Sequence, residues 1–394
     1  MDGRHEDARE RLLAKVLDGR LSRREALRRA AAMGLSVPLV AAVLAGRRGA
    51  VMAQEATPGA AEQPTATLTL FRDMTPAEGA EMVDTADFRK DGDVTLGFSD
   101  WSTVNTWRVQ ARGEAEILAR NLGVEMRVTD ANNDANKQIA DVEDLLAQGI
   151  DALVVTPGSS EALGPTIERV ADTGIPVIVW STAPGTDNYT AEVHADDPFF
   201  GVAGMEQLAK DMGGRGMLIG LRGIAGISVE TDRWNGMQQV LEQYPDIELV
   251  GSDYGDWALD KGKQVAQNLL AAHPQIDGVW SSGAAMTVGA IEAFQEADRP
   301  LPPMSGEHLN SFLKLWQDLG LKSVAPVYPT WQGAEAVKLA LMALRGEPIA
   351  KNYLLKPPPI TNEGLAEAVK PDLPDDYWVE GYLTDEEVEE IFSS

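Results

Sequence analysis

The sequence contains no cysteine and far fewer basic than acidic side chains. The absence of cysteine from all 394 residues excludes a disulfide scaffold, a thiolate metal site, a thiol nucleophile and a cysteine lipid anchor. The 34 Lys and Arg against 61 Asp and Glu give a formal charge of −27, which disfavours nucleic acid as a partner. Because 44% of the residues are apolar, the chain can bury a substantial core. A small-molecule binder or an enzyme fits these limits.

Several catalytic motifs are also missing from the sequence. It has no Gly-x-x-x-x-Gly-Lys-Ser/Thr phosphate loop, no Gly-x-Ser-x-Gly elbow and no His-Glu-x-x-His pair. Carboxylates are so frequent in this acidic chain that no pair of them stands out as a catalytic acid and base. We therefore expect no cofactor, no metal site and no enzymatic step, with an α/β enzyme kept as a minor alternative.

The first 53 residues differ in charge from the rest of the chain. They hold eleven Lys and Arg against six Asp and Glu, a charge of +5, so the remainder carries −32. Arg23 and Arg24 precede an uncharged stretch at 30–46, and small residues lead to a processing site before Gln54. This pattern predicts an export signal of the twin-arginine type. The alternatives are an N-terminal amphipathic helix pair and a helix-turn-helix DNA reader.

Short apolar runs alternate with helical periods from Val94 onward. Strict alternation of this kind predicts parallel sheets with helices on both faces. About ten strands exceed one ordinary sheet, so the fold class is α/β with two doubly wound lobes. The predicted strands are 94–98, 124–128, 152–155, 176–180, 217–221, 247–253, 278–281, 303–305 and 323–327. The helices best defined by pattern are 198–212, 233–243, 259–272, 286–297 and 332–345.

Ligands of such sheets lie in the loops beyond the carboxyl ends of the strands. The loop after the first strand, 99–108, places two tryptophans among hydroxyl and amide side chains. Flat rings cover the C–H faces of a polyhydroxylated ligand while polar groups pair its hydroxyls, so Asn105 and Trp107 are candidate site residues. The alternative for Trp107 is that it is simply the first core residue of its helix.

The second half of the chain offers further candidates at loops. Arg233 is predicted at the start of a helix, where the dipole opposes a cation, so it needs a partner: either Asp232 or ligand oxygens. Trp257 precedes another helix and offers a third ring. His308 and Asn310 follow the strand at 303–305 and are candidate polar contacts.

From Val94 to about Ile349 the sequence resembles periplasmic sugar-binding proteins of the ribose/galactose type, the ligand-capturing subunits of ABC importers. The resemblance is carried by residues 94–116, 130–180, 223–236 and 264–280. It implies a type I periplasmic binding protein fold, two lobes joined by three crossing segments that close on a ligand. Lac-repressor-type regulators share this core and remain the alternative.

The resemblance also implies roles for individual residues. Trp107 and Trp257 match the aromatic residues that stack on the sugar from the two lobes, Asn105 a polar neighbour, and Arg233 an arginine that donates to sugar oxygens. At the positions where the resemblance implies polar partners of the sugar hydroxyls, this sequence has other residues. Ribose, galactose and glucose are therefore not assumed to be its ligands. The changed positions are Ser181, Thr182, Gly283 and His308, with Glu307 and Asn310 as replacement contacts.

Together these features predict an exported, monomeric binding protein of the periplasm or cell envelope. Its partners are a monosaccharide or polyol and an ABC permease, with no nucleic acid and no stable membrane insertion. Thr384 begins a capping box for a final acidic helix. The expected parts are an export signal (1–53), a linker and N-terminal extension (54–92), an N-terminal lobe (93–195 plus 328–352), a C-terminal lobe (196–327) and a C-terminal extension (353–394).

Overall fold

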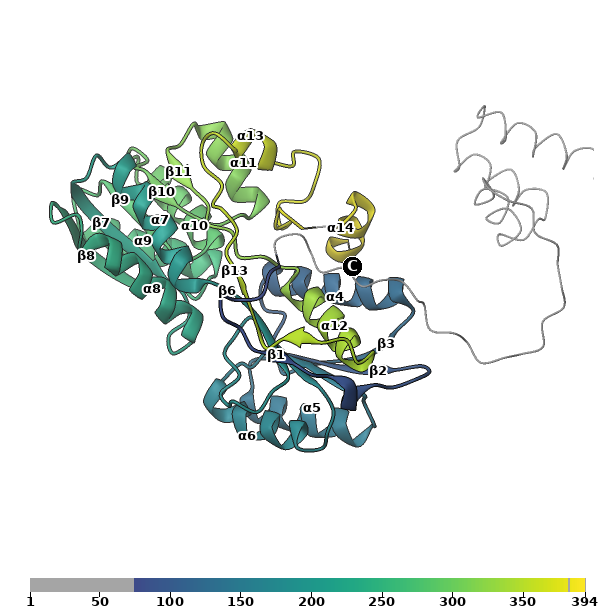
Figure 1. Cartoon of the computed structure of the whole chain (residues 1–394). Helices are drawn as coiled ribbons and strands as arrows, with labels where there is room; N and C mark the ends of the chain where they lie inside the picture. The colour runs from purple at the N-terminus through teal and green to yellow at the C-terminus, as the bar shows by residue number, and fades with distance from the viewer. Residues whose placement is uncertain (1–73, 382, 394) are drawn as a thin grey trace, which may run out of the picture. The chain divides into compact units, whose positions relative to one another are not determined.

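Two sheets in which every strand pair is parallel form the frame of the protein (Figure 1). The structure, a computed structural model, describes residues 74–381 and 383–393. The six-stranded sheet has the order β13 (Asn352–Leu355), β6 (Ala191–Ala195), β5 (Val177–Trp180), β4 (Ala152–Val155), β2 (Thr95–Asp100) and β3 (Glu125–Asp130). The five-stranded sheet has the order β11 (Ser323–Val324), β10 (Met304–Ser305), β9 (Gly278–Ser281), β7 (Gly216–Arg222) and β8 (Ile247–Tyr254).

Both sheets are doubly wound, as the sequence predicts. In each, the first strand lies between the second and the third, so the winding reverses between β2 and β4 and again between β7 and β9. Such a reversal opens a crevice at the carboxyl ends of the strands. The two lobes thus present equivalent loops for a ligand, and the predicted fold class is confirmed.

Helices cover both faces of each sheet. β4 and β5 are buried throughout, which explains their unbroken apolar sequences. In the six-stranded lobe, α4 (Thr106–Leu122) and α12 (Gln332–Leu344) cover one face, and α5 (Ala135–Ala147) and α6 (Ser160–Ala171) cover the other (Figure 1). In the five-stranded lobe, α7 (Asp197–Asp211) packs on α8 (Ser228–Leu241), and α9 (Leu259–Ala272) on α10 (Ala284–Glu296).

Three segments of chain pass between the lobes. The first joins β6 to α7 at Asp196, the second runs from β11 to α12, and the third follows β13. Ala325 of the second and Ile360 of the third form an antiparallel bridge, and the Asp196 N–H donates to the Leu355 carbonyl. The three-segment connection expected from the family resemblance is therefore present.

The remaining elements flank the two lobes. β1 (Met82–Val83) pairs antiparallel with β12 (Ile349–Ala350), and η1 (Ala86–Phe88) follows β1. α11 (Asn310–Leu319) packs on α10, while α13 (Leu365–Ala368) and α14 (Asp385–Phe392) lie in the C-terminal extension. Thr384 and Glu387 form the predicted capping box at the start of α14.

Four features differ from the sequence-based expectation. β6 and α11 were not anticipated, and α8 begins at Ser228 instead of Arg233. The longer helix follows from burial, because Val229 and Arg233 lie one turn apart on its inward face. β13 straddles the boundary expected at residue 352 and completes the six-stranded sheet.

Candidate functional site

The loop between β2 and α4 is held in shape by its own side chains. The Asn105 Oδ1 caps α4 by accepting the Arg108 N–H at 2.9 Å, and the Ser102 Oγ accepts the Val104 N–H at 3.1 Å. Capping occupies only the amide oxygen of Asn105, so its Nδ2 is the end of the side chain that can donate to a ligand. The loop is thus prearranged before any ligand arrives.

Trp107 belongs to the core and to the pocket at once. Its side chain is 7% exposed, and its Nε1 donates to the Tyr328 carbonyl at 2.8 Å. The ring stacks on Trp180 with centroids 6.2 Å apart and tilts against the Tyr328 ring at 5.2 Å. Its burial agrees with the core alternative, and the residue also lines the cavity.

Arg108 places a positive charge in the same wall. It donates to the Thr156 hydroxyl at 3.1 Å and lies 3.5 Å from the buried Asp100 carboxylate. Burial raises the pKa of Asp100 to about 6, against the lowering effect of Arg108. The guanidinium also lies over the rings of Trp107 and Trp180, 5.4 and 5.6 Å from their centroids.

Trp257 faces the cavity from the five-stranded lobe. Its ring rests on the backbone at two glycines, because a Cβ at Gly223 or Gly283 would lie 2.3 or 2.6 Å from ring atoms. The indole Nε1 donates to the Ser282 carbonyl and hydroxyl at 3.1 and 3.0 Å. Only glycine leaves room for a ring at these positions, which gives a physical reason for Gly283 at the position where the resemblance implies an asparagine.

Arg233 is buried within the pocket wall. The expectation that it begins a helix next to Asp232 was wrong: it lies one turn into α8, and its partners come from other elements. Its Nε contacts Asp197 at 3.1 Å, and its Nη1 contacts the Ser282 carbonyl at 2.7 Å and Glu307 at 3.4 Å. The dipole argument therefore does not apply, and a fixed guanidinium results.

Two carboxylates share this one guanidinium. Burial raises the pKa of both Asp197 and Glu307 to about 7, although Arg233 lowers each. Burial opposes the charge on Arg233 as well, but the two carboxylates outweigh it and raise its pKa. The guanidinium stays charged. Any change of protonation in this cluster near neutral pH therefore falls on the Asp197 and Glu307 carboxyls.

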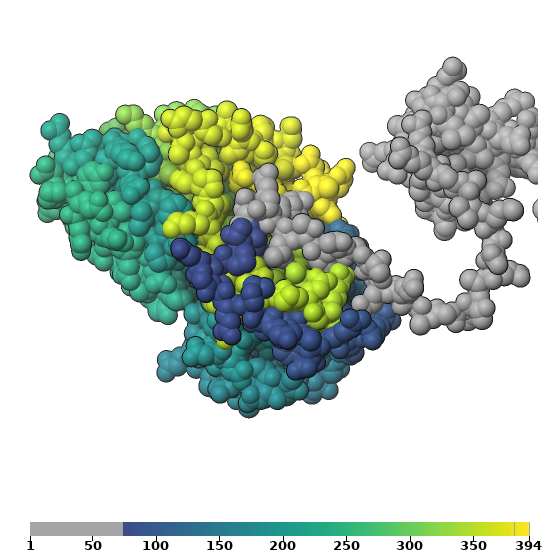
Figure 2. Space-filling model, in the orientation of Figure 1, coloured from purple at the N-terminus to yellow at the C-terminus, as the bar shows by residue number. Residues whose placement is uncertain are grey.

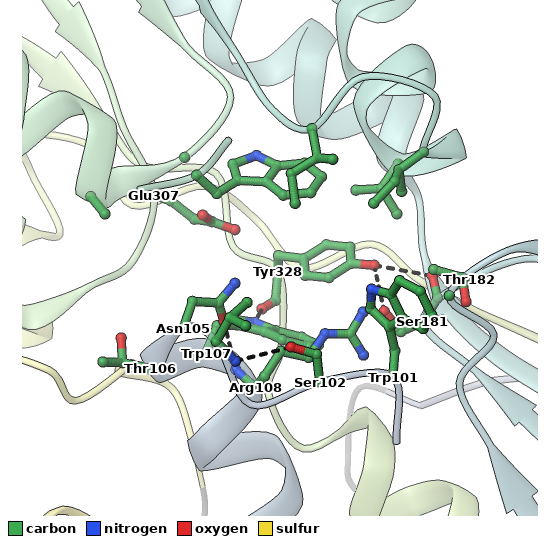
Figure 3. A pocket seen from close by; sticks show the side chains of 18 of the residues that line it. Trp101, Ser102, Asn105, Thr106, Trp107, Arg108, Ser181, Thr182, Glu307 and Tyr328 are labelled. Carbon is green, nitrogen blue, oxygen red and sulfur yellow. Dashed lines mark hydrogen bonds between the residues drawn. The ribbon is translucent and has the colours of Figure 1, made fainter. Parts of the chain in front are cut away.

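Tyr328 connects the two halves of the site (Figure 3). It lies on the second crossing segment, and its hydroxyl contacts the Ser181 hydroxyl and carbonyl, each at 3.1 Å. Ser181 adopts a left-handed backbone with φ of 67°, which turns the chain at the end of β5. The Arg233 guanidinium lies 4.4 Å from the centroid of the Tyr328 ring.

These groups surround a cavity that leaves about 890 Å³ free of protein atoms, part of it open to solvent. The loops that follow β2, β4, β5, β7 and β9 all contribute to its wall. Its lining residues are Trp101, Ser102, Val104, Asn105, Thr106, Trp107, Arg108, Asn133, Pro157, Gly158, Ser181, Thr182, Ile224, Ile227, Val229, Arg233, Trp257, Gly283, Ala284, Ala285, Glu307, Tyr328 and Trp378.

Five of the seven candidate residues line this cavity: Asn105, Trp107, Ser181, Arg233 and Trp257. His308 and Asn310 are fully buried and are not among the lining residues. Burial lowers the pKa of His308 to about 3, so its ring is neutral, and its Nδ1 accepts the Tyr328 N–H at 3.4 Å. The Asn310 amide contacts backbone groups of the C-terminal extension.

Four prominent lining residues were not among the candidates: Trp101, Arg108, Tyr328 and Trp378. Trp101 and Arg108 belong to the loop already singled out, so its aromatic and charged composition could have identified them. Trp101 lies over Gly158, where a Cβ would be 1.7 Å from its ring. Tyr328 and Trp378 lie far along the chain and carry no local sequence signal.

Among residues 74–381 and 383–393, no three His, Asp or Glu side chains gather as a metal site. Within the same ranges, no helix has the length and apolar character needed to cross a bilayer.

The chain belongs to the periplasmic binding protein domain family, which matches residues 96–348. It is 34% identical over 192 residues to the xylitol-binding protein of Mycolicibacterium smegmatis, covering 48% of this chain but only 55% of that relative. It is 27% identical to the ribose import binding protein RbsB of Bacillus subtilis, covering 65% of this chain and 84% of the relative.

A similar solved structure is an ABC transporter solute-binding protein from Mycobacterium smegmatis with bound glycerol. It shares 25% identity and a TM-score of 0.67, covering 71% of this chain and 98% of that one. Another, from Bacillus halodurans with bound myo-inositol, has 25% identity and a TM-score of 0.64, covering 70% and 97%. These relatives are binding proteins, so the prediction of a non-enzymatic sugar-binding family is confirmed.

Proposed function

We propose that the protein captures an uncharged sugar or polyol between its two lobes and delivers it to the permease of an ABC importer. The observation that carries this proposal is the cavity at the carboxyl ends of both sheets, where tryptophan faces alternate with hydroxyl, amide and guanidinium groups. Ring faces cover C–H surfaces, and fixed polar groups discriminate between hydroxyl patterns. The named ligands of the relatives, xylitol, ribose, glycerol and myo-inositol, share this chemistry.

We propose ligand contact for the five candidates in the wall. Trp107 and Trp257 would stack on the ligand from opposite lobes, and Asn105 and Ser181 would pair its hydroxyls. Arg233 would supply a donor held in place by its carboxylate partners. His308 and Asn310 stay predictions, and their buried positions put them behind the wall.

Calorimetric titration of residues 54–394 with xylitol, D-ribose, D-galactose, glycerol and myo-inositol tests the binding function. We expect saturable binding of at least one of them, weakened by Trp257→Ala. Lys263→Gln is the control, because Lys263 pairs with Glu292 and Glu296, and none of the three lines the cavity. A folded protein that binds no member of a wider carbohydrate and polyol panel would overturn the proposal.

We also propose that the leader at 1–53, which lies outside the described residues, exports the protein by the twin-arginine route and that the mature chain is a monomer. Changing Arg23 and Arg24 together to Lys should leave uncleaved precursor in the cytoplasmic fraction. Normal export of this variant would argue against the route without touching the binding function. Delivery to a permease predicts that deleting the gene abolishes uptake of the radiolabelled ligand.

A further inference from the structure

The C-terminal extension is tied to the five-stranded lobe at the start of α11. The Asn310 Nδ2 donates to the carbonyls of Lys370, Leu373 and Pro374 at 2.8, 3.2 and 3.0 Å, and its Oδ1 accepts the Lys370 N–H at 3.0 Å. Leu309 and Trp378 form an antiparallel backbone bridge. A buried amide that satisfies four backbone contacts fixes the path of this segment.

The same segment is tied to the six-stranded lobe through α4. The Gln110 Nε2 donates to the Trp378 carbonyl at 2.9 Å, and the Gln110 Oε1 accepts the Trp378 N–H at 2.8 Å. The Trp378 Nε1 donates to the Thr106 hydroxyl at 3.0 Å. Further along, α14 packs on α4, and Arg120 pairs with Glu390.

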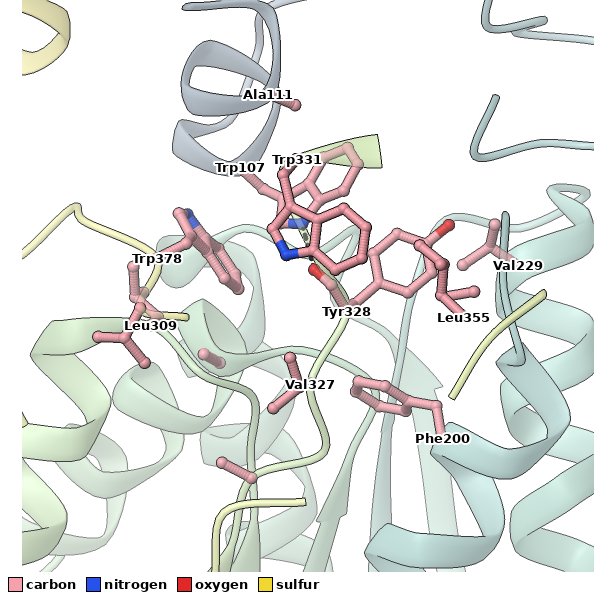
Figure 4. Close-up of a cluster of buried hydrophobic side chains, with 14 of the residues drawn as sticks. Trp107, Ala111, Phe200, Val229, Leu309, Val327, Tyr328, Trp331, Leu355 and Trp378 are labelled. Carbon is pink, nitrogen blue, oxygen red and sulfur yellow. Dashed lines mark hydrogen bonds between the residues drawn. The ribbon is translucent and has the colours of Figure 1, made fainter. Parts of the chain in front are cut away.

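Trp378 lies where these two sets of contacts meet. Its side chain is 5% exposed, lines the cavity, and sits edge-on to His308 with centroids 5.2 Å apart. Figure 4 shows its ring between Leu309 and the cluster of Trp107, Trp331 and Tyr328. The space-filling view shows the extension in yellow as a band at the surface beside the green part of the five-stranded lobe (Figure 2).

We infer that residues 370–381 and 383–393 form a strap across both lobes and that Trp378 is a specificity-determining residue of the ligand pocket. The contact with ligand rests on the proposed binding function, whereas the strap does not. Because Trp378 contacts both lobes, opening the cleft must break either its contacts with α4 or those with His308 and Leu309. The strap therefore limits opening and removes one ring from the wall whenever it detaches.

The variants Trp378→Ala and Trp378→Phe test the inference, with Trp316→Phe as a matched control. Trp316 is also buried, and its Nε1 donates to the Leu321 carbonyl at 3.0 Å within the five-stranded lobe, away from the cavity lining. With xylitol and D-ribose as probes, we expect Trp378→Ala to weaken binding roughly tenfold or more and to change the ratio of the two affinities. Trp378→Phe should weaken binding less, and Trp316→Phe should leave it unchanged.

Amide hydrogen exchange without ligand provides an independent measurement. We expect faster exchange in both 106–114 and 308–311 in the Trp378 variants, because altering the ring that contacts Thr106 and His308 loosens the backbone contacts of this residue with Gln110 and Leu309. Faster exchange in only one of these stretches would overturn the strap. Unchanged affinity in a folded Trp378→Ala or Trp378→Phe protein would overturn the ligand contact. A wild-type protein that binds no carbohydrate or polyol would refute the binding function, and exchange would still decide on the strap.

Discussion

The two lobes share a strand order but reverse the charges at one equivalent position. In the six-stranded lobe, Asp100 ends β2 and lies 3.5 Å from Arg108, eight residues later on α4. In the five-stranded lobe, Arg222 ends β7 and contacts Glu230, eight residues later on α8, through two bonds of 2.6 and 3.0 Å. Topology fixes where an ion pair can form, and the local sequence decides which end carries the cation.

This reversal changes which charged side chains of each lobe line the cavity. Arg108 lines the cavity with its carboxylate behind it, whereas neither Arg222 nor Glu230 does. The five-stranded lobe instead brings in Arg233, one turn further along α8 than Val229. The six-stranded side is otherwise rich in hydroxyls and amides, and the five-stranded side is mostly apolar. The two lobes can therefore bind different faces of one ligand.

The largest expected effect is on stability and distinguishes Trp107 from Trp257, which line the cavity from the two lobes. Trp107→Ala should lower the free energy of unfolding by about 3–5 kcal/mol, because it removes a ring packed on Trp180 and Tyr328. Trp257 is only partly buried, so Trp257→Ala should cost much less stability while weakening ligand binding by roughly 1–3 kcal/mol. Chemical denaturation and calorimetry measure the two effects, and equal stability losses would contradict the distinction.

The Arg222–Glu230 pair should show the next largest effect. Glu230 is 2% exposed at its side chain, so Glu230→Gln leaves a cation that has lost its charged partner in a largely buried site. We expect a loss of about 3 kcal/mol in the free energy of unfolding without a change in ligand affinity. The exposed pair Arg169–Glu143 is the control, since Glu143→Gln should change little. If Glu230→Gln has the same free energy of unfolding as the wild type, the two-bond ion pair does not stabilise the fold.

The smallest expected effect comes from Asp100, and it depends on pH. Its folded pKa of about 6 lies above the ordinary aspartate value of 3.8, so the folded state favours the protonated carboxyl. The stability contributed by that preference is present below about pH 4 and is lost as the pH rises to about 6. Asp100→Asn should therefore match the wild type near pH 4 and exceed it at pH 8 by on the order of 2 kcal/mol.

Urea denaturation of both proteins from pH 4 to pH 8 measures this difference. Asp197, Glu307 and Glu114 also have raised pKa values, so the wild-type curve alone is not diagnostic. The difference between the two proteins isolates Asp100. A constant difference across the range would mean that Arg108 already holds this carboxylate ionised.

Most of the frame could be predicted because its signals are local. β4, β5 and β9 are short, fully buried strands, and such strands appear as unbroken apolar runs. β6 and α11 were missed although both carry local signals, since burial alternates along β6 and Phe312, Leu313 and Trp316 follow a helical period in α11.

The site was only partly predictable, because several of its partners lie far apart in the sequence. Asn105 and Trp107 lie in a loop whose composition is unusual, and the structure brings both to the cavity. The partners of Arg233 are separated from it by 36 and 74 residues, so the neighbouring Asp232 was chosen instead. Trp378 pairs with Gln110 across 268 residues, a separation that leaves no trace in local pattern.

The three crossings between the lobes also determine the order in which the two sheets are completed during synthesis. The five-stranded lobe is one continuous stretch between β6 and α12, whereas the six-stranded lobe needs α12 and β13, which are made after it. Domains generally fold as units while the chain emerges. The sheet that begins first is therefore finished last, and a nascent chain that stops before β13 holds every strand of the five-stranded sheet but not of the six-stranded one.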